Sequence, residues 1–193
     1  MSESEQDQDE LHELRFYVRR NIRYHLRRFA FFTKWSRLTA FLGVLFGSAA
    51  AATLMAKAPA EVTAVFAVLV TIASAIDLIV GTSQRAALHN DLRRCYLEIE
   101  EELDTAGWLD AEPRRKLWAK IRRIEGDEPP ALPVLELMAR NDVICAMFDG
   151  DERSEHFIPI PGHMRATAHW INWDTSDLRP SPNPTCQVEA SPA

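Results

Sequence analysis

One acidic residue stands inside a long apolar stretch of the sequence. Asp77 is the one charged residue in the run from Val62 to Gln84. Thr71, Ser74 and Gly81 recur with it at steps of three, three and four, so a helix places all four on one face. An ionised carboxylate at the bilayer centre costs roughly 2.5 to 3.5 kcal/mol, whereas each Leu, Ile, Val or Phe returns only about 0.3 to 0.6 kcal/mol. Such a face fits contact with protein or water better than contact with acyl chains.

Two interpretations of this polar face stay open. Thr71, Ser74, Asp77 and Gly81 line a conduit or gate in the first, and several copies of the chain must then assemble because two helices cannot enclose a pore. In the second, the same residues pack against the neighbouring helix and Asp77 reaches an Arg or Lys at headgroup level.

Other polar residues do not form a pattern typical of catalysis. The sequence has no nucleophile elbow, phosphate-binding loop, dinucleotide fingerprint or catalytic triad. Asp127 and Glu128 stand beside prolines and fit an exposed linker, and Asp149-Gly-Asp151 lacks the other ligand positions of a calcium loop. Three histidines match no zinc spacing: His156, His163 and His169. We therefore expect no catalytic residue, no metal and no cofactor.

Two weakly charged stretches predict a transmembrane hairpin. Residues 38–56 read LTAFLGVLFGSAAAATLMA, without a charge, and their helical length matches a hydrocarbon core of about 30 Å. Residues 62–84 are long enough to return with some tilt. A five-residue link containing Pro59 leaves only an antiparallel arrangement. Gly43 and Gly47 form a GxxxG motif and are candidates for close packing in the hairpin.

Basic residues flank the predicted hairpin at its two outer ends, against a single Lys57 in the link. The positive-inside rule therefore places both termini in the cytoplasm. An amphipathic helix over residues 11–34 leads into the first span, and its apolar stripe is expected to pack on another helix. Lipid headgroups are the expected contacts of five residues: Arg19, Arg23, Arg27, Lys34 and Trp35. A nucleic-acid partner is a weaker alternative for this basic helix.

The average composition hides a strong local pattern. A net charge of -6 and a hydrophobic fraction of 47% resemble a soluble protein, yet eight basic residues fall between Arg15 and Arg37. The chain from Glu125 onward is mostly acidic. Three widely spaced cysteines predict reduced thiols: Cys95, Cys145 and Cys186. The first apolar run begins only at Leu38, too late for a secretory signal.

The predicted fold is an all-α membrane protein, with the hairpin between an N-terminal amphipathic helix and C-terminal cytosolic helices. An acidic leader over residues 1–10 is expected to be disordered. The two-transmembrane helical core covers residues 11–149, and the second membrane helix is expected to continue into the cytosol as one rod. Cytosolic helices are predicted over 11–34, 85–105, 110–125 and 133–148. Residues 150–178 are expected to be irregular and partly packed, and residues 179–193 form a disordered tail.

Three segments carry a resemblance to a known family. They are the stretch QRAALHNDL from Gln84, the acidic-proline turn IEGDEPP from Ile124, and LELMARND from Leu135. With the charged helix and the hairpin, they make residues 11–149 resemble the SLATT family, two-transmembrane effector domains associated with SMODS nucleotidyltransferases and SLOG domains. The segment from Asp151 onward lies outside the shared core.

This resemblance implies a function as well as a fold. It implies a non-enzymatic effector of a bacterial conflict or antiphage defence system, which forms a homo-oligomer and permeabilises the inner membrane. The trigger would come from a partner such as a nucleotidyltransferase or its nucleotide second messenger. Two alternatives stay open: a non-conducting membrane anchor or scaffold that recruits a cytosolic partner, and a phage holin-like protein.

Overall fold

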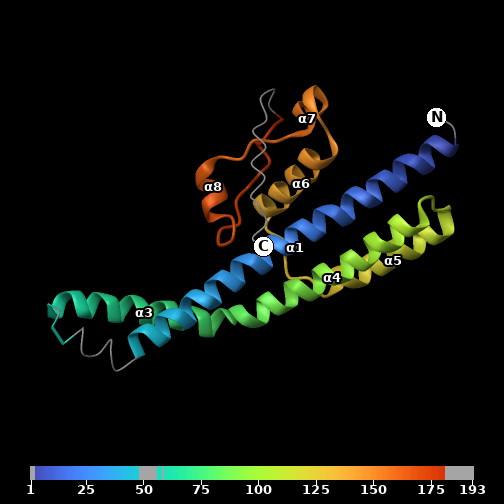
Figure 1. The fold of residues 1–193 in the computed structure, drawn as a ribbon. Helices are drawn as coiled ribbons and strands as arrows, with labels where there is room; N and C mark the ends of the chain where they lie inside the picture. Colours follow the sequence, from blue (N-terminus) through green and yellow to red (C-terminus); the bar gives the residue numbers. More distant parts are fainter. Residues whose placement is uncertain (1–2, 48–55, 58, 181–193) are drawn as a thin grey trace. The chain divides into compact units, whose positions relative to one another are not determined.

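The protein is all-helical over the residues that the structure describes, which are 3–47, 56–57 and 59–180. In this computed structural model (Figure 1), no strand occurs within those ranges. The helices are α1 (Glu3–Gly47), α3 (Ala60–Val80), α4 (Thr82–Ala106), α5 (Ala111–Gly126), α6 (Pro133–Met147), α7 (Gly150–His156) and α8 (Gly162–Thr167). Helices α5 and α6 lie within one residue of the helices that the sequence predicts over 110–125 and 133–148.

The chain divides into two compact units. The central unit is Arg28–His89, and the flanking unit combines Met1–Arg27 with Asn90–Ala193. Helix α1 contributes residues to both units, and so does α4. Each unit has its own packing and is described by itself.

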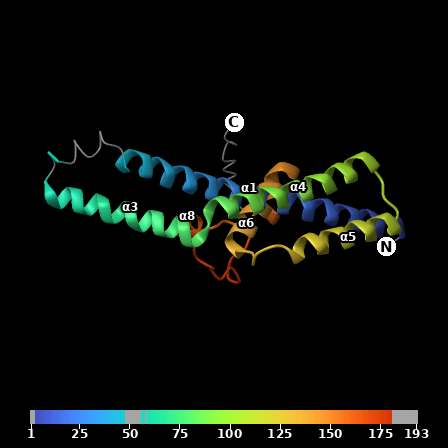
Figure 2. The ribbon, with the colours of Figure 1, turned by 90° about the horizontal axis from the view of Figure 1, so that it is seen from below.

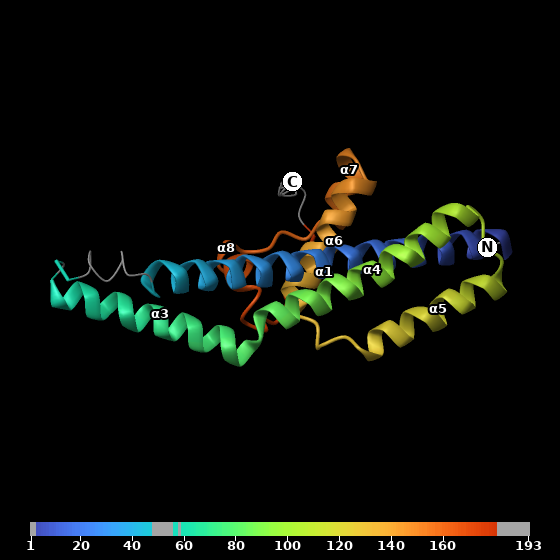
Figure 3. The same ribbon diagram turned by 60° about the horizontal axis from the view of Figure 1, so that its bottom comes forward.

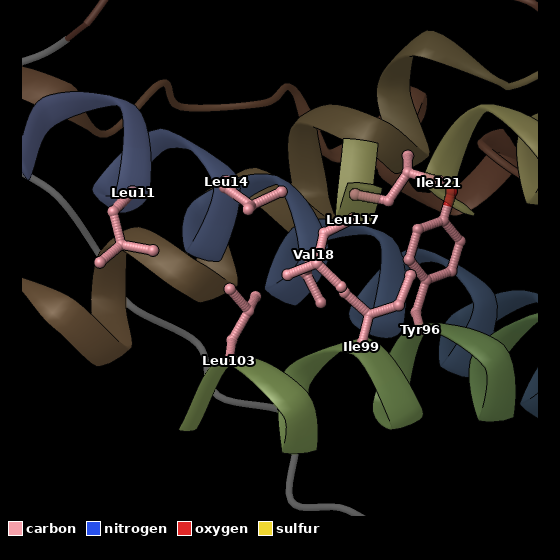
Figure 4. Packing of buried hydrophobic residues seen from close by; sticks show 8 residues of the cluster. All are labelled: Leu11, Leu14, Val18, Tyr96, Ile99, Leu103, Leu117 and Ile121. Carbon is pink, nitrogen blue, oxygen red and sulfur yellow. The ribbon is translucent and has the colours of Figure 1, made fainter. Parts of the chain in front are cut away.

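The main core of the flanking unit lies between α1, α4 and α5. Figures 2 and 3 show these three helices side by side. Leu11, Leu14 and Val18 recur at steps of three and four, so they share one face of α1. Figure 4 shows them packed against residues of the other two helices: Tyr96, Ile99, Leu103, Leu117 and Ile121. Full burial of one such aliphatic side chain contributes about 1.5 to 3 kcal/mol, so this core accounts for the position of α5 on α1 and α4.

The first ten residues differ from the predicted disordered leader. Helix α1 begins at Glu3, and Asp7 and Glu10 reach the guanidinium of Arg114 in α5, each with an N···O distance of 2.7 Å. Arg114 is 4% exposed, so two carboxylates compensate a buried charge. The hydrogen bond to Asp7 raises the pKa of Arg114. The local acidic composition gave no sign of this partner, because more than 100 positions separate Asp7 from Arg114.

A second core in the flanking unit holds the C-terminal segments. Val134, Leu135 and Ala139 of α6 pack with Tyr24 and Ala168, and α6 contacts both α7 and α8. Asn141 links α6 to the loop after α7. Its side-chain N–H donates to the carbonyl of Ile158 at 2.6 Å, and its Oδ1 accepts from the Ile158 N–H at 3.2 Å. Residues 150–178 therefore pack as expected, but two short helices replace part of the irregular segment.

The membrane segments are described only in part. Within the described residues, one helix is long and apolar enough to cross a membrane, α3 with 21 residues. The predicted first span, 38–56, ends outside those residues because α1 is described only to Gly47. The two-helix hairpin is therefore not shown. The predicted rod over the second span is interrupted at Gly81, which has a φ of 63° between α3 and α4.

The C-terminal tail and the cysteines complete the comparison with the sequence. Residues 181–193, most of the predicted tail, lie outside the described residues, as does Cys186. Cys95 carries a free thiol, whereas Cys145 is disulfide-bonded. The expectation of reduced thiols is wrong for Cys145, because spacing along the chain does not report which sulfur atoms the fold brings together.

We predict that Arg114→Leu destabilises the flanking unit by about 1 to 3 kcal/mol, because Asp7 and Glu10 lose their buried partner. Chemical unfolding of the full chain in detergent, followed by circular dichroism, measures the change. Lys116→Leu is the matched control, since Lys116 and its partner Glu112 are both about three-quarters exposed. An exposed pair of this kind contributes about 0.3 to 0.5 kcal/mol. Equal losses in the two variants would contradict the assignment of Asp7 and Glu10 as structural partners.

Candidate functional site

Helix α3 carries the polar residues that the sequence singled out. Thr71, Ser74 and Asp77 lie on α3 at steps of three, and Gly81 is the residue at its C-terminal cap. The Thr71 hydroxyl donates to the carbonyl of Ala67 at 2.8 Å, and Thr71 and Ser74 are exposed. The hydroxyl of Thr71 thus has a partner in its own helix, which lowers the cost of placing it in an apolar medium.

The position of Asp77 reduces its penalty. Helix α3 ends at Val80, three residues after Asp77, which is about 4.5 Å by helical rise. Eleven Val, Ile, Leu and Phe residues in α3 return about 3 to 7 kcal/mol on insertion scales, against about 2.5 to 3.5 kcal/mol for an Asp at the bilayer centre. The apolar residues offset most or all of the cost of a central Asp, and Asp77 stands only one turn from the helix end, where the cost is lower.

The helix break after Asp77 gathers polar atoms at one point. Gly81 takes the left-handed conformation and its N–H donates to the carbonyl of Asp77 at 2.9 Å. The hydroxyl of Thr82 donates to Oδ1 of Asp77, and Thr82 is 2% exposed. The Arg85 Nε–H donates to the carbonyl of Val80 at 2.9 Å. Asp77 is therefore part of a helix cap, and the sequence signal that marks it is Gly81 followed by two hydroxyl residues.

An aromatic seam joins α1 to α4 within the central unit, and the sequence did not indicate it. The guanidinium carbon of Arg28 lies 4.5 Å from the centroid of the Phe32 ring. Phe32 stacks on His89 with centroids 5.7 Å apart and an interplanar angle of 9°. All three side chains are at most 8% exposed. A cation over an aromatic face is stabilising and more so when water is excluded, so this seam fixes the two helices together.

The residues predicted to meet lipid headgroups divide into two groups. Arg19 and Arg27 bind carboxylates of other helices in the flanking unit: Arg19 Nε lies 2.9 Å from Glu100, and Arg27 binds both oxygens of Asp142. These contacts agree with packing on the protein. Lys34 is exposed, and Arg23 and Trp35 are half-buried. An added Cβ at Gly43 meets nothing within 4 Å, and the surroundings of Gly47 lie outside the described side chains.

The acidic-proline turn is held by aromatic and imidazole groups. Glu128 accepts from the Tyr96 hydroxyl at 2.7 Å, and its Oε1 lies 3.2 Å from Nε2 of His25. The Tyr17 hydroxyl donates to Glu125. Burial, with the bond to Glu125, raises the pKa of Tyr17 to about 12. Burial and the bond to Glu128 likewise raise the pKa of Tyr96 far above its usual range.

These polar contacts do not form a recognisable catalytic or metal centre. Among the described residues, no group of three or more His, Cys, Asp or Glu side chains is placed to hold a metal ion. Asp149 binds Arg153 one turn later at 2.6 Å. Glu125 and Glu128 accept hydrogen bonds from the hydroxyls of Tyr17 and Tyr96. These bonds hold the acidic-proline turn in place.

We predict that alkaline pH weakens the flanking unit through Tyr17. The pKa of Tyr17 is 10 in its ordinary state and about 12 in the folded protein, so the folded state holds the proton more tightly. Its stabilising contribution is complete below the lower value and is lost as pH rises from about 10 to about 12. Unfolding by urea at about pH 9 and about pH 11.5 measures this loss. Tyr17→Phe should show a smaller loss than the original chain, and an identical loss contradicts the role of this hydroxyl.

We predict that Gly81→Ala destabilises the central unit by about 1 to 2 kcal/mol, because a Cβ in the left-handed region meets the following backbone. It also meets Oε1 of Gln84 at 2.9 Å. Gly81→Asn should lose less, since Asn tolerates this conformation. Gly43→Ala is the control, because the site is open and Ala favours a helix. Unfolding in mixed detergent micelles measures all three, and an equal response at Gly81 and Gly43 contradicts the prediction.

No family model, curated protein or solved structure matches the chain. The resemblance to the SLATT family stays a prediction from the residues quoted for it.

Proposed function

We propose that the chain is a pore-forming effector of a bacterial conflict or antiphage defence system. It assembles as a homo-oligomer in the inner membrane and permeabilises that membrane on a signal from a partner such as a nucleotide second-messenger synthase. It acts without a catalytic residue, and both termini are cytoplasmic.

The observation that carries this proposal is the exposure of α3. None of its 21 residues is buried. Leu78 and Ile79 are more than four-fifths exposed, and Val65, Val68 and Leu69 are each more than half exposed. Apolar surface of this extent in water opposes solubility, whereas it is favourable against acyl chains. A helix has its backbone hydrogen bonds satisfied internally, so α3 can enter the bilayer intact.

The last residues of α1 support a second span and hence the hairpin. Leu38, Phe41 and Val44 are all more than half exposed. They open the stretch 38–56, which carries no charge. A hairpin with both termini inside agrees with the basic residues that precede Leu38 and follow Gln84.

Asp77 with Thr71 and Ser74 is the proposed conducting face. Exposed polar groups on an otherwise apolar helix are satisfied when copies of the helix surround water, and a ring of carboxylates favours cations. A second function, a non-conducting anchor, has its own support: Asp77 already accepts a hydrogen bond from Thr82 and so needs no water-filled path.

The discriminating experiment is flux from liposomes that contain the purified full chain. We expect release of potassium and a several-fold reduction by Asp77→Asn, which keeps size and removes the charge. Glu61→Gln, at the first turn of the same helix, is the matched control and should conduct like the original chain. An oligomer that never conducts, also in the presence of its partner, overturns the pore and leaves the anchor.

A further inference from the structure

Helix α5 presents a basic face that the core does not use. Leu117 and Ile121 point into the flanking unit, and the exposed side of the same helix carries Arg115, Lys116, Arg122 and Arg123. Arg115 and Arg122 are seven positions apart, so they stand two turns apart on one stripe. Within the described residues neither makes a hydrogen bond or an ion pair.

Helix α4 presents a face of the opposite sign. Glu98 and Glu101 are exposed and three positions apart, and neither has an ion-pair partner in the part of the chain that the structure describes. A shallow depression runs along this side of α4, lined by Glu98, Glu101, Glu102, Thr105 and Ala106. Both the acidic and the basic face therefore belong to the flanking unit.

One contact inside the chain already joins the two helices by the same chemistry. Lys120 of α5 binds Glu102 of α4. This pair does not involve the other charges of the two faces. They are Arg115 and Arg122 on α5, and Glu98 and Glu101 on α4. A chain of net charge -6 repels its own copies unless opposite charges are brought together.

We propose that the basic face of α5 in one copy docks on the acidic face of α4 in a second copy. The inference rests on the proposed homo-oligomer for the identity of the occupant and adds the surface that holds it. A second copy supplies an acidic face for α5 and a basic face for α4, so both faces gain a partner of opposite charge. An unrelated acidic protein would bind the α5 face only. Confinement of all copies to one membrane raises their effective concentration, so a contact made of exposed charges suffices.

The test uses the full chain in a non-ionic detergent, with oligomer size read by light scattering. One variant reverses the basic face, Arg115→Glu with Arg122→Glu, and the other reverses the acidic face, Glu98→Arg with Glu101→Arg. The first variant leaves the α5 face with two acidic and two basic residues, and the second places basic residues on both faces, so neither keeps a basic face opposite an acidic one. Glu152→Arg with Glu155→Arg, exposed on α7, is the matched control for the acidic-face variant because it makes the same change of charge elsewhere.

We expect association to fall by about tenfold or more in either face variant and to return when the two are mixed, because each supplies the face that the other lacks. The mixture also shows that both variants are folded. Raising salt to about 1 M, where the Debye length is about 3 Å, should weaken the original oligomer in the same way.

Three results overturn the inference. Unchanged association of both face variants does so and leaves the proposed function intact. Equal dissociation of the α7 control also overturns the inference. Association would then depend on the net charge of the chain and not on the two faces. An original chain that stays monomeric under all these conditions overturns both the inference and the homo-oligomer of the proposed function.

Discussion

Helix α3 exposes apolar side chains that the described residues do not bury, and the proposed insertion into a membrane depends on this exposure. No residue of α3 is fully buried, although some are half-buried, so the hydrophobic effect contributes less to it in water than to the core helices of the flanking unit. In the proposed insertion, a bilayer supplies the rest without any tertiary contact. The surrounding sequence then has two tasks, to end the apolar segment cleanly and to provide a unit that is stable outside it. The cap at Asp77, Gly81 and Thr82 serves the first task.

The flanking unit serves the second task with two cores and a set of paired polar groups, called the polar layer below. The layer consists of groups that are costly to bury singly and acceptable when paired: Tyr96 and His25 on Glu128, and Arg27 on Asp142. Because most of these partners are far apart in sequence, the layer forms only when the helices are correctly aligned. It therefore selects one arrangement of α1, α4 and α6, in addition to any stability it contributes.

The sequence predicted those features that depend on local patterns. Helices α5 and α6 were placed to within one residue, since Pro113 and Pro133 mark their first turns and apolar residues recur along them. The N-terminal helix was predicted from residue 11, but its first turns were missed because their partner, Arg114, is distant in sequence. The roles of Arg19 and Arg27 were missed for the same reason: an arginine stripe fits lipid phosphate and protein carboxylate equally well by composition. Thr71, Ser74 and Asp77 were placed on one helix correctly, because their spacing is itself the signal.

The left-handed residue at Gly81 has a consequence for how the two halves of the chain can change. Along an unbroken helix, each residue is rotated about the axis by a fixed angle from the residue before it. The residues before and after Gly81 would then share one continuous set of faces. A residue at positive φ changes this angle at one point. The face of Ser74 and Asp77 on α3 is therefore not an extension of the face that α4 begins with at Thr82. A change in the sequence of α3 can consequently alter its polar face without altering the helical periodicity of α4.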